Sequence, residues 1–215
     1  MPTFDDRYRT TRNVLGSGPD RIIEMYAALM SPVLPVLDVG AGQGRNTFYL
    51  ARWGFTVDAV EPAASGAAAI AEVVEGEGIP VRVHTCGFED FEGEPAGHAG
   101  ILLIGTTQVL SRDGIASLFE RADAWTASRG LVFVTAFTVD DARYEFHKRE
   151  WSEVGHHSFA GPDGEVRTYL EPDELKSFFN GYKVVHYREG PGPEHSHGNG
   201  SVERHSLVEA VFRKP

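Results

Sequence analysis

The sequence has little cysteine, no long apolar run and no excess of basic charge. Cys86 is the single cysteine among 215 residues, which excludes a framework of disulfides within the chain. No apolar run reaches the ~18 residues of a membrane-spanning helix, and the polar first residues lack the apolar core of a secretory signal. We therefore predict a cytoplasmic protein that has no membrane partner.

The charge balance argues against nucleic acid as a partner. Twenty basic residues stand against 31 acidic ones, which gives a formal net charge of −11. A protein that neutralises many phosphates needs the opposite balance. The length of 215 residues, without internal repeats or a linker, predicts one domain over residues 1–215.

Apolar periodicity predicts helices and short strands that alternate along most of the chain. The expected helices are 20–30, 45–53, 63–75, 113–127 and 171–180. The expected strands are 35–39, 56–60, 80–85, 101–105, 131–137, 182–188 and 204–213. This β-α rhythm predicts a parallel sheet with helices on both faces, and the turn-rich link between the last two strands predicts an antiparallel hairpin.

Two segments stand outside this alternation. Residues 1–30 form an N-terminal arm followed by the first helix. Residues 138–170 are polar and mixed, and they interrupt the rhythm directly after the strand expected at 131–137. We interpret residues 138–170 as an insertion that covers the substrate. Within it, the charged run 140–150 is expected to be a solvated helix face.

A glycine loop directly after the first expected strand is the strongest local signal. Gly40, Gly42 and Gly44 stand at alternate positions, where glycine permits backbone angles that other residues resist. The dinucleotide fingerprint is G-x-G-x-x-G, whereas here the third glycine comes one position early. Asp38 would repel a pyrophosphate and suits a ligand with an ammonium group, and Glu61 is placed to accept hydrogen bonds from ribose hydroxyls. The plainer reading is a tight strand-to-helix turn.

This pattern resembles the class I S-adenosylmethionine-dependent methyltransferases, through Asp38-Val39-Gly40-Ala41-Gly42-Gln43-Gly44 followed by Val60-Glu61-Pro62. Further matches are similar to the tellurite-resistance (TehB-type) branch, namely Asp6-Arg7-Tyr8, Thr11-Arg12, Gly44-Arg45-Asn46, Tyr49-Leu50-Ala51, Glu194-His195 and Asn199-Gly200. The resemblance implies a Rossmann-like, doubly wound α/β fold with a seven-stranded, mostly parallel sheet. It also implies S-adenosylmethionine as cofactor and S-adenosylhomocysteine as product.

The resemblance also implies roles for individual residues. The expected cofactor-binding residues are Tyr8, Arg12, Asp38, Gly40, Gly42, Gly44, Asn46, Glu61, Pro62, Cys86, Gly87, Phe88 and Thr106. Cys86 departs from the family, which often has an aspartate there for the adenine edge. Four of these residues also have a purely structural interpretation: Cys86 as a small buried residue, Phe88 as core, Arg12 as surface and Thr106 as a cap.

Methyl transfer from a sulfonium is an in-line displacement that needs alignment more than a metal, and an acceptor that must lose a proton needs a base. His195 and Arg204 are the expected catalytic residues, and His197 and His205 are alternative bases. His195, His197 and His205 together, or the pair His156-His157, would also suit a metal. We expect solvated histidines and no metal site.

The predicted function is therefore methyl transfer to a small molecule, either a metabolite or a metalloid oxyanion, by a monomer or homodimer. A nicotinamide (NAD-dependent) oxidoreductase is the second hypothesis, and a non-catalytic S-adenosylmethionine-binding regulatory module is the third. The sequence after the strand 101–105 lacks the Asn/Asp-Pro-Pro-Tyr signature of base-methylating enzymes, since Thr106-Thr107-Gln108-Val109 stands there.

Overall fold

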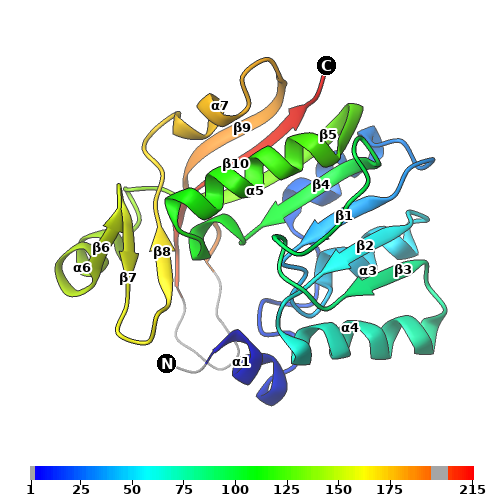
Figure 1. The fold of residues 1–215 in the computed structure, drawn as a ribbon, viewed down its shortest axis with the longest axis horizontal. Coiled ribbons are helices and arrows are strands. Elements are labelled where there is room, and N and C mark those ends of the chain that lie inside the picture. Colours follow the sequence, from blue (N-terminus) through cyan, green and yellow to red (C-terminus); the bar gives the residue numbers. More distant parts are fainter. Residues whose placement is uncertain (1–2, 195–202) are drawn as a thin grey trace.

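A computed structural model describes residues 3–194 and 203–215, and Figure 1 shows their fold. One seven-stranded sheet has the order β3-β2-β1-β4-β5-β10-β9. Its strands are β1 (Val36–Val39), β2 (Val57–Val60), β3 (Val81–His84), β4 (His98–Ile104), β5 (Thr126–Phe137), β9 (Lys183–Pro191) and β10 (Ser206–Arg213). The first five pair in parallel, and β10 pairs antiparallel to both β5 and β9. The predicted doubly wound fold with a C-terminal hairpin is confirmed.

Helices cover both faces of this sheet (Figure 1). They are α1 (Phe4–Thr10), α2 (Arg21–Tyr26), α3 (Arg45–Arg52), α4 (Ala64–Glu77), α5 (Arg112–Trp125), α6 (Tyr144–Glu150) and α7 (Glu174–Phe178), with 3-10 turns η1 (Ala27–Leu29) and η2 (Thr107–Val109). Successive strand residues face opposite sides. Leu37 and Ile101 therefore join the core under α5, whereas Val36 and Leu102 join the core under α2 and α3. No helix in the described part of the chain is long and apolar enough to cross a membrane.

Two of the differences from the sequence-based expectation lie at the start of the chain and at the end of α5. α1 was not predicted, because its residues are polar and its start depends on a capping box in which Thr3 and Asp6 exchange hydrogen bonds. The helix expected at 113–127 ends at Trp125, and β5 begins at once at Thr126 rather than at 131. The Thr126 hydroxyl donates to the carbonyl of Ala122 at 2.5 Å, which closes the last turn of α5.

The insertion 138–170 contains its own small sheet. Three antiparallel strands, β6 (Ser152–Gly155), β7 (Ser158–Ala160) and β8 (Val166–Thr168), follow α6 and project to one side of the main sheet (Figure 1). Tyr144, Phe159 and Tyr169 form its buried aromatic cluster, against which Phe137 packs. The Thr168 hydroxyl donates to the carbonyl of Leu110 at 2.6 Å, so the small sheet is fixed to the loop that follows β4.

A buried aspartate joins strands β2, β3 and β4 through its side-chain hydrogen bonds. Asp58 on β2 accepts two hydrogen bonds from the Arg82 guanidinium, at 2.7 and 2.6 Å, and one from each of two histidines, His84 at 2.9 Å and His98 at 3.3 Å. Burial alone would raise the pKa of Asp58, but these hydrogen bonds hold it well below its ordinary value. Asp58 thus stays ionised as part of the scaffold.

The N-terminal arm lies against α4. Asp5 accepts a hydrogen bond from the Ser65 backbone N–H at 2.7 Å, and the Tyr8 side chain is buried at this contact. Gly66 makes the close approach possible. A Cβ atom there would stand 2.7 Å from the carbonyl oxygen of Gly42 and 2.9 Å from the Tyr8 ring. The arm, α4 and the glycine loop therefore share one contact.

Gly66→Ala is expected to lower the free energy of unfolding by about 1–3 kcal/mol, because the new methyl group overlaps backbone and ring atoms. The matched control is Gly76→Ala in the same helix, where a Cβ meets nothing within 4 Å. That control should raise stability by about 0.5–1 kcal/mol through helix propensity alone. Urea unfolding of both variants measures the contrast, and equal effects at the two positions would contradict the packing described.

Candidate active site

The glycine loop lies at the carboxyl edge of the parallel sheet, between β1 and α3. Gly40, Gly42 and Gly44 all have positive φ, at 73°, 60° and 87°. This left-handed region strains any residue with a side chain. The backbone N–H groups of Gly40 and Ala41 donate to the carbonyl of Val60 at 2.8 and 3.1 Å, which holds the loop against the end of β2. The alternate glycines are therefore required by the backbone itself.

Glu61 joins this loop to the end of β2. Its carboxylate accepts hydrogen bonds from the Gly42 N–H at 2.7 Å and from the Ala63 N–H at 2.8 Å. Burial, which leaves only 4% of the residue exposed, raises the pKa of Glu61 to about 7, against the lowering effect of these two donors. A carboxylate has about four acceptor positions, so two remain for a ligand such as a ribose diol.

Asp38 and Asn46 point into the scaffold around the loop. Asp38 is buried and accepts a hydrogen bond from the Thr47 hydroxyl of α3 at 2.6 Å, and burial raises the pKa of Asp38 to about 6. The Asn46 side-chain oxygen accepts from the backbone N–H of Asp20 at 2.8 Å. In this structure these contacts orient α3 and the segment before α2.

The arm residues contact the other side of the loop. The Tyr8 hydroxyl lies 3.1 Å from the place of a Cβ at Gly42, whereas the Arg12 side chain is 85% exposed and pairs with Glu72 of α4 at 3.3 Å. Sequence reasoning missed Gln43, whose side chain donates to the Thr11 carbonyl and accepts from the Val14 N–H, both at 2.9 Å. An open hollow of about 330 Å³ lies between the arm and α4.

The residues expected at the adenine end follow β2 and β3. Pro62 is exposed, and Cys86 is half-buried, with its thiol pKa raised by burial and by Asp90. A Cβ at Gly87 would stand 2.6 Å from a carboxylate oxygen of Glu89. Phe88 is buried in the core cluster under α5. Pro62, Cys86 and Gly87 thus lie at the surface of this edge, and Phe88 lies behind it.

The loop after β4 lies beside the first glycine. The Thr106 hydroxyl donates to the Val39 carbonyl at 2.7 Å, and a Cβ at Gly40 would stand 2.7 Å from that hydroxyl oxygen. Gln108 follows in η2, and its side-chain oxygen is buried with no hydrogen-bond partner among the described residues. A buried acceptor without a donor is costly, so Gln108 suits a ligand that carries an N–H or O–H group.

The carboxyl end of β5 and the start of β10 hold a buried acid–imidazole pair that sequence reasoning only half identified. His205 Nδ1 lies 2.9 Å from an oxygen of Asp141, and the His205 ring stacks on Phe137 with centroids 4.4 Å apart. Asp141 also accepts from the backbone N–H groups of Arg143 and Ser206, both at 2.9 Å. Its place in the charged run 140–150 predicted solvent exposure, and the two backbone donors that bury it leave no signal in sequence.

The other C-terminal residues divide between the described and undescribed parts of the chain. Arg204 is exposed, and its Nε donates to the carbonyl of Gly192 at 2.9 Å. His195 and His197, together with the Asn199-Gly200 pair, lie outside the described residues. The structure therefore positions Arg204 at the base of this loop and says nothing of the two loop histidines.

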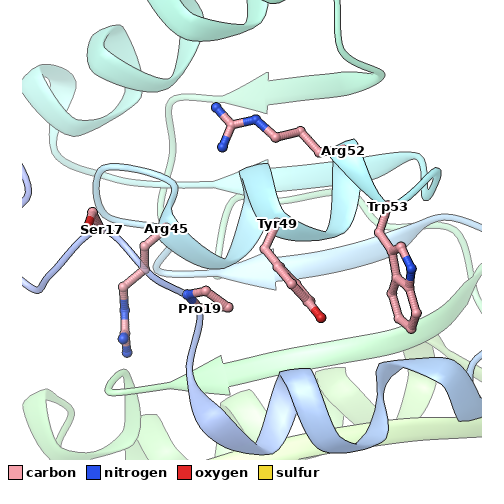
Figure 2. A pocket seen from close by; sticks show the side chains of 6 residues that line it. All are labelled: Ser17, Pro19, Arg45, Tyr49, Arg52 and Trp53. Carbon is pink, nitrogen blue, oxygen red and sulfur yellow. The ribbon is translucent and has the colours of Figure 1, made fainter.

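A second hollow, of about 250 Å³, lies on the outer face of α3 (Figure 2). Its lining comprises Ser17, Pro19, Arg45, Tyr49, Arg52 and Trp53. Figure 2 shows Arg45 and Arg52 pointing in opposite directions, and each is paired with a carboxylate, Asp20 for Arg45 and Glu77 for Arg52. This hollow presents neither glycine-loop backbone nor a buried acid, and it is separate from the site at the sheet edge.

Comparison with known proteins adds to this geometry. Residues 36–130, from β1 into β5, match a family model described as a methyltransferase domain. No curated protein matches the chain. The TehB protein of Haemophilus influenzae has 19% sequence identity and a TM-score of 0.71, over 99% of this chain and 68% of that one.

Two further solved structures are similar. The 1,6-didemethyltoxoflavin-N1-methyltransferase of Burkholderia thailandensis, with bound 1,6-didemethyltoxoflavin and S-adenosylhomocysteine, has 20% identity and a TM-score of 0.66, over 90% of this chain and 75% of that one. The CcbJ methyltransferase of Streptomyces caelestis has 18% identity and a TM-score of 0.64, over 99% and 96%. These likenesses establish the fold. The family model agrees with the predicted resemblance to methyltransferases over residues 36–130, which is less than half of the chain.

Glu61→Gln is expected to change how stability depends on pH. The pKa of Glu61 rises from 4.5 to about 7 on folding, so between these values the folded chain holds a proton that the unfolded chain releases. Glu61 therefore stabilises the protein below pH 4.5, and this contribution, about 3 kcal/mol, is lost as pH rises toward 7. The glutamine of the variant does not titrate, so the variant does not lose this stability as the pH rises.

Urea unfolding of the wild type and Glu61→Gln across pH 4.5–8 measures this difference. The stability of the wild type relative to the variant should fall steadily with pH over the lower part of the range and become level above about pH 7. A difference that stays constant across the range would show that Glu61 titrates as an ordinary exposed glutamate.

Proposed function

We propose that this chain transfers a methyl group from S-adenosylmethionine to a small-molecule acceptor by in-line displacement. The observation that carries the proposal is Glu61, a buried carboxylate at the end of β2 whose two free acceptor positions lie beside a loop of left-handed glycines. The methyltransferase-domain match spans both features. The alternate glycine spacing disfavours the nicotinamide alternative, because the dinucleotide fingerprint places its third glycine one residue later.

In this proposal the cofactor lies across the carboxyl ends of β1, β2 and β3. Its ribose is held by Glu61, its methionine part by Gly40, Gly42 and Gly44, and its adenine by Pro62, Cys86, Gly87 and Phe88. Asp38, Asn46 and Thr106 hold the loop in shape, as their hydrogen bonds support. Tyr8 and Arg12 close over the cofactor from the arm. Glu61 accepts hydrogen bonds from the two ribose hydroxyls in its ionised form. Cofactor binding would therefore release the proton that buried Glu61 holds up to about neutral pH.

The acceptor is proposed to lie beside Thr106 and Gln108, under the insertion 138–170. The buried Gln108 oxygen favours an acceptor with an N–H or O–H donor. A small organic metabolite fits this better than a metalloid oxyanion, and the similar Burkholderia enzyme holds 1,6-didemethyltoxoflavin. We place the activity in the cytoplasm, with the chain as a monomer or homodimer and without nucleic acid or membrane as partner.

His205 is the proposed base for an acceptor that loses a proton, and Asp141 orients its ring through Nδ1. In this proposal Nε2 receives the proton, and it lies 3.6 Å from a carboxylate oxygen of Glu203. Arg204 and His195, which precede β10, remain candidates for orienting the acceptor. When bound, S-adenosylmethionine would supply a methyl group on a positively charged sulfur, and its transfer would leave the electron pair of the broken carbon–sulfur bond on a neutral thioether sulfur.

Calorimetric titration tests the cofactor assignment. The wild type should bind S-adenosylhomocysteine and not NAD, and Glu61→Ala should weaken binding about 10- to 150-fold through loss of the charged hydrogen bonds, worth about 1.5–3 kcal/mol. Glu77→Ala, an exposed acid at the far end of α4, is the control and should bind as the wild type does. Binding of NAD, or full affinity in Glu61→Ala, would overturn the assignment.

Formation of S-adenosylhomocysteine tests catalysis. Offered N–H and O–H metabolites, with tellurite and selenite as metalloid oxyanions, the wild type should turn over at least one acceptor. Asp141→Asn should lower kcat about 100-fold without changing KM for the cofactor, because the imidazole loses its orienting acid. His186→Gln on β9 is the control. Tight cofactor binding with no turnover of any acceptor would favour the regulatory-module alternative.

A further inference from the structure

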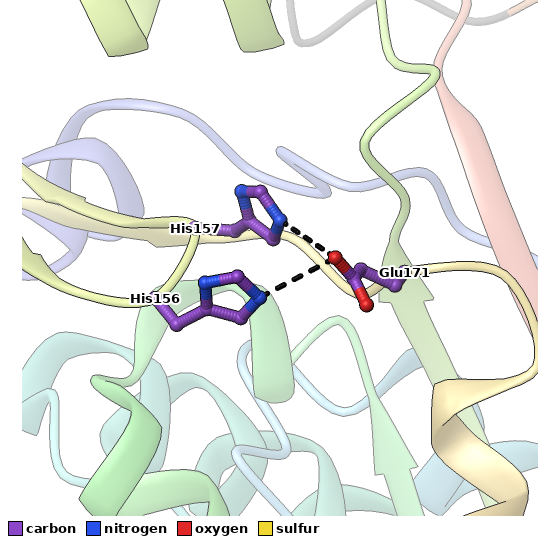
Figure 3. Close-up of side chains that lie close together, drawn as sticks. All are labelled: His156, His157 and Glu171. Atoms are coloured by element: carbon purple, nitrogen blue, oxygen red, sulfur yellow. Dashed lines mark hydrogen bonds and ion pairs between the residues drawn. The ribbon is translucent and has the colours of Figure 1, made fainter.

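Two histidines and a glutamate converge where the insertion meets the segment before α7. His156 and His157 form the turn between β6 and β7, and Glu171 follows β8 by a few residues. Figure 3 shows both rings directed at the same carboxylate oxygen. His157 Nε2 lies 3.1 Å from it and His156 Nε2 lies 3.4 Å from it. Among the described residues, this is the group of three whose ligand atoms all lie within 4.8 Å of one another.

The separations fit a bound cation. Zinc lies about 2.0–2.1 Å from imidazole nitrogen and carboxylate oxygen, so ligand atoms at the corners of a tetrahedron are about 3.3–3.4 Å apart. Both nitrogen–oxygen distances in this cluster are close to that spacing. The two imidazole rings are inclined by 41° with centroids 4.0 Å apart. A cation would therefore need only small side-chain adjustments.

Independent features fix His157 for such a role. Its Nδ1 lies 2.6 Å from the Tyr144 hydroxyl, the kind of outer contact that sets the tautomer of a metal-binding histidine and leaves Nε2 for the metal. Its backbone has φ of 52°, a left-handed angle that is costly for a histidine and is held by the hydrogen bond from the Tyr169 N–H to its carbonyl at 2.9 Å. The surrounding structure thus fixes the direction of the ring.

One arginine supports both sides of the cluster. Arg112 donates to the carbonyl of His156 at 2.6 Å and also pairs with Glu174. Glu174 in turn accepts from the backbone N–H of Glu171 at 2.7 Å. The turn that carries the histidines and the segment that carries the acid are therefore attached to the same side chain at the start of α5.

We propose that His156, His157 and Glu171 form a binding site for a divalent transition metal of the zinc type. Two imidazole nitrogens and a carboxylate oxygen suit such ions, and three protein ligands leave one position for water. The open position faces solvent, since His156 and Glu171 have side-chain exposures of 66% and 53%. The ion would join the small sheet to the chain entering α7. The sequence favoured no metal because the histidine pair alone lacks its third ligand, which folding supplies from position 171.

Metal titration of the untagged, full-length, metal-stripped protein tests this proposal. Zinc binding followed by calorimetry should give one ion per chain, and cobalt should show the intense visible absorption of a four-coordinate site. His156→Ala, His157→Ala and Glu171→Gln should each weaken zinc binding about tenfold or more, and Tyr144→Phe should weaken it less. The double variant His195→Ala/His197→Ala removes the other histidine pair and should bind as the wild type does.

Three outcomes would each overturn the site. They are wild-type protein that binds no stoichiometric zinc, binding that survives the three ligand substitutions, and binding that disappears in the loop double variant. Circular dichroism of the metal-free variants checks that they fold. Histidine NMR of the unaltered protein gives a second measurement that needs no variant, since zinc should shift the ring signals of His156 and His157 and leave those of His84 unchanged.

Discussion

The contact between the Glu61 carboxylate and the Gly42 N–H is the interaction on which the site depends. It joins the end of β2 to the turn after β1, and together with the Ala63 N–H it holds a carboxyl group in a place that solvent hardly reaches. Such burial is unfavourable for a charge unless a partner compensates for it. The fold therefore maintains an acid whose hydrogen-bonding capacity is only partly used, and the glycine angles keep the adjoining backbone close to it.

Two additions to the sheet lie near its carboxyl edge, and Arg7 of the arm is 3.9 Å from the carboxylate of Glu165 in the insertion. The arm with α1 lies over α4 and the glycine loop, and the insertion with β6, β7 and β8 is fixed to the loop after β4. Thr106, Gln108 and the Asp141–His205 pair all lie at the carboxyl edge of the parallel strands. In open α/β sheets ligands bind at this edge. The arm contacts the proposed cofactor side and the insertion contacts the proposed acceptor side.

The regular part of the fold was predictable because it follows from local chemistry. Apolar runs such as 35–39 and 56–60 and the left-handed glycines are encoded position by position, so the parallel strands, the hairpin and the loop were anticipated. What sequence could not supply were contacts between distant segments. Asp141 is buried because β10 returns beside β5, and Gln43 binds an arm whose helix begins at a two-residue capping box. Glu171 meets His156 and His157 only after three short strands fold back.

Two buried acids of opposite proton affinity stand three positions apart, Asp58 in β2 and Glu61 directly after it. Asp58 is surrounded by donors from Arg82, His84 and His98 and remains ionised, whereas burial makes Glu61 hold its proton up to about neutral pH. Mild acidification thus neutralises Glu61, which lies beside the proposed ligand, and leaves Asp58 charged. Of these two acids only Glu61 changes its charge across the neutral range, so the same change of pH alters the stability of the fold through Glu61 and not through Asp58.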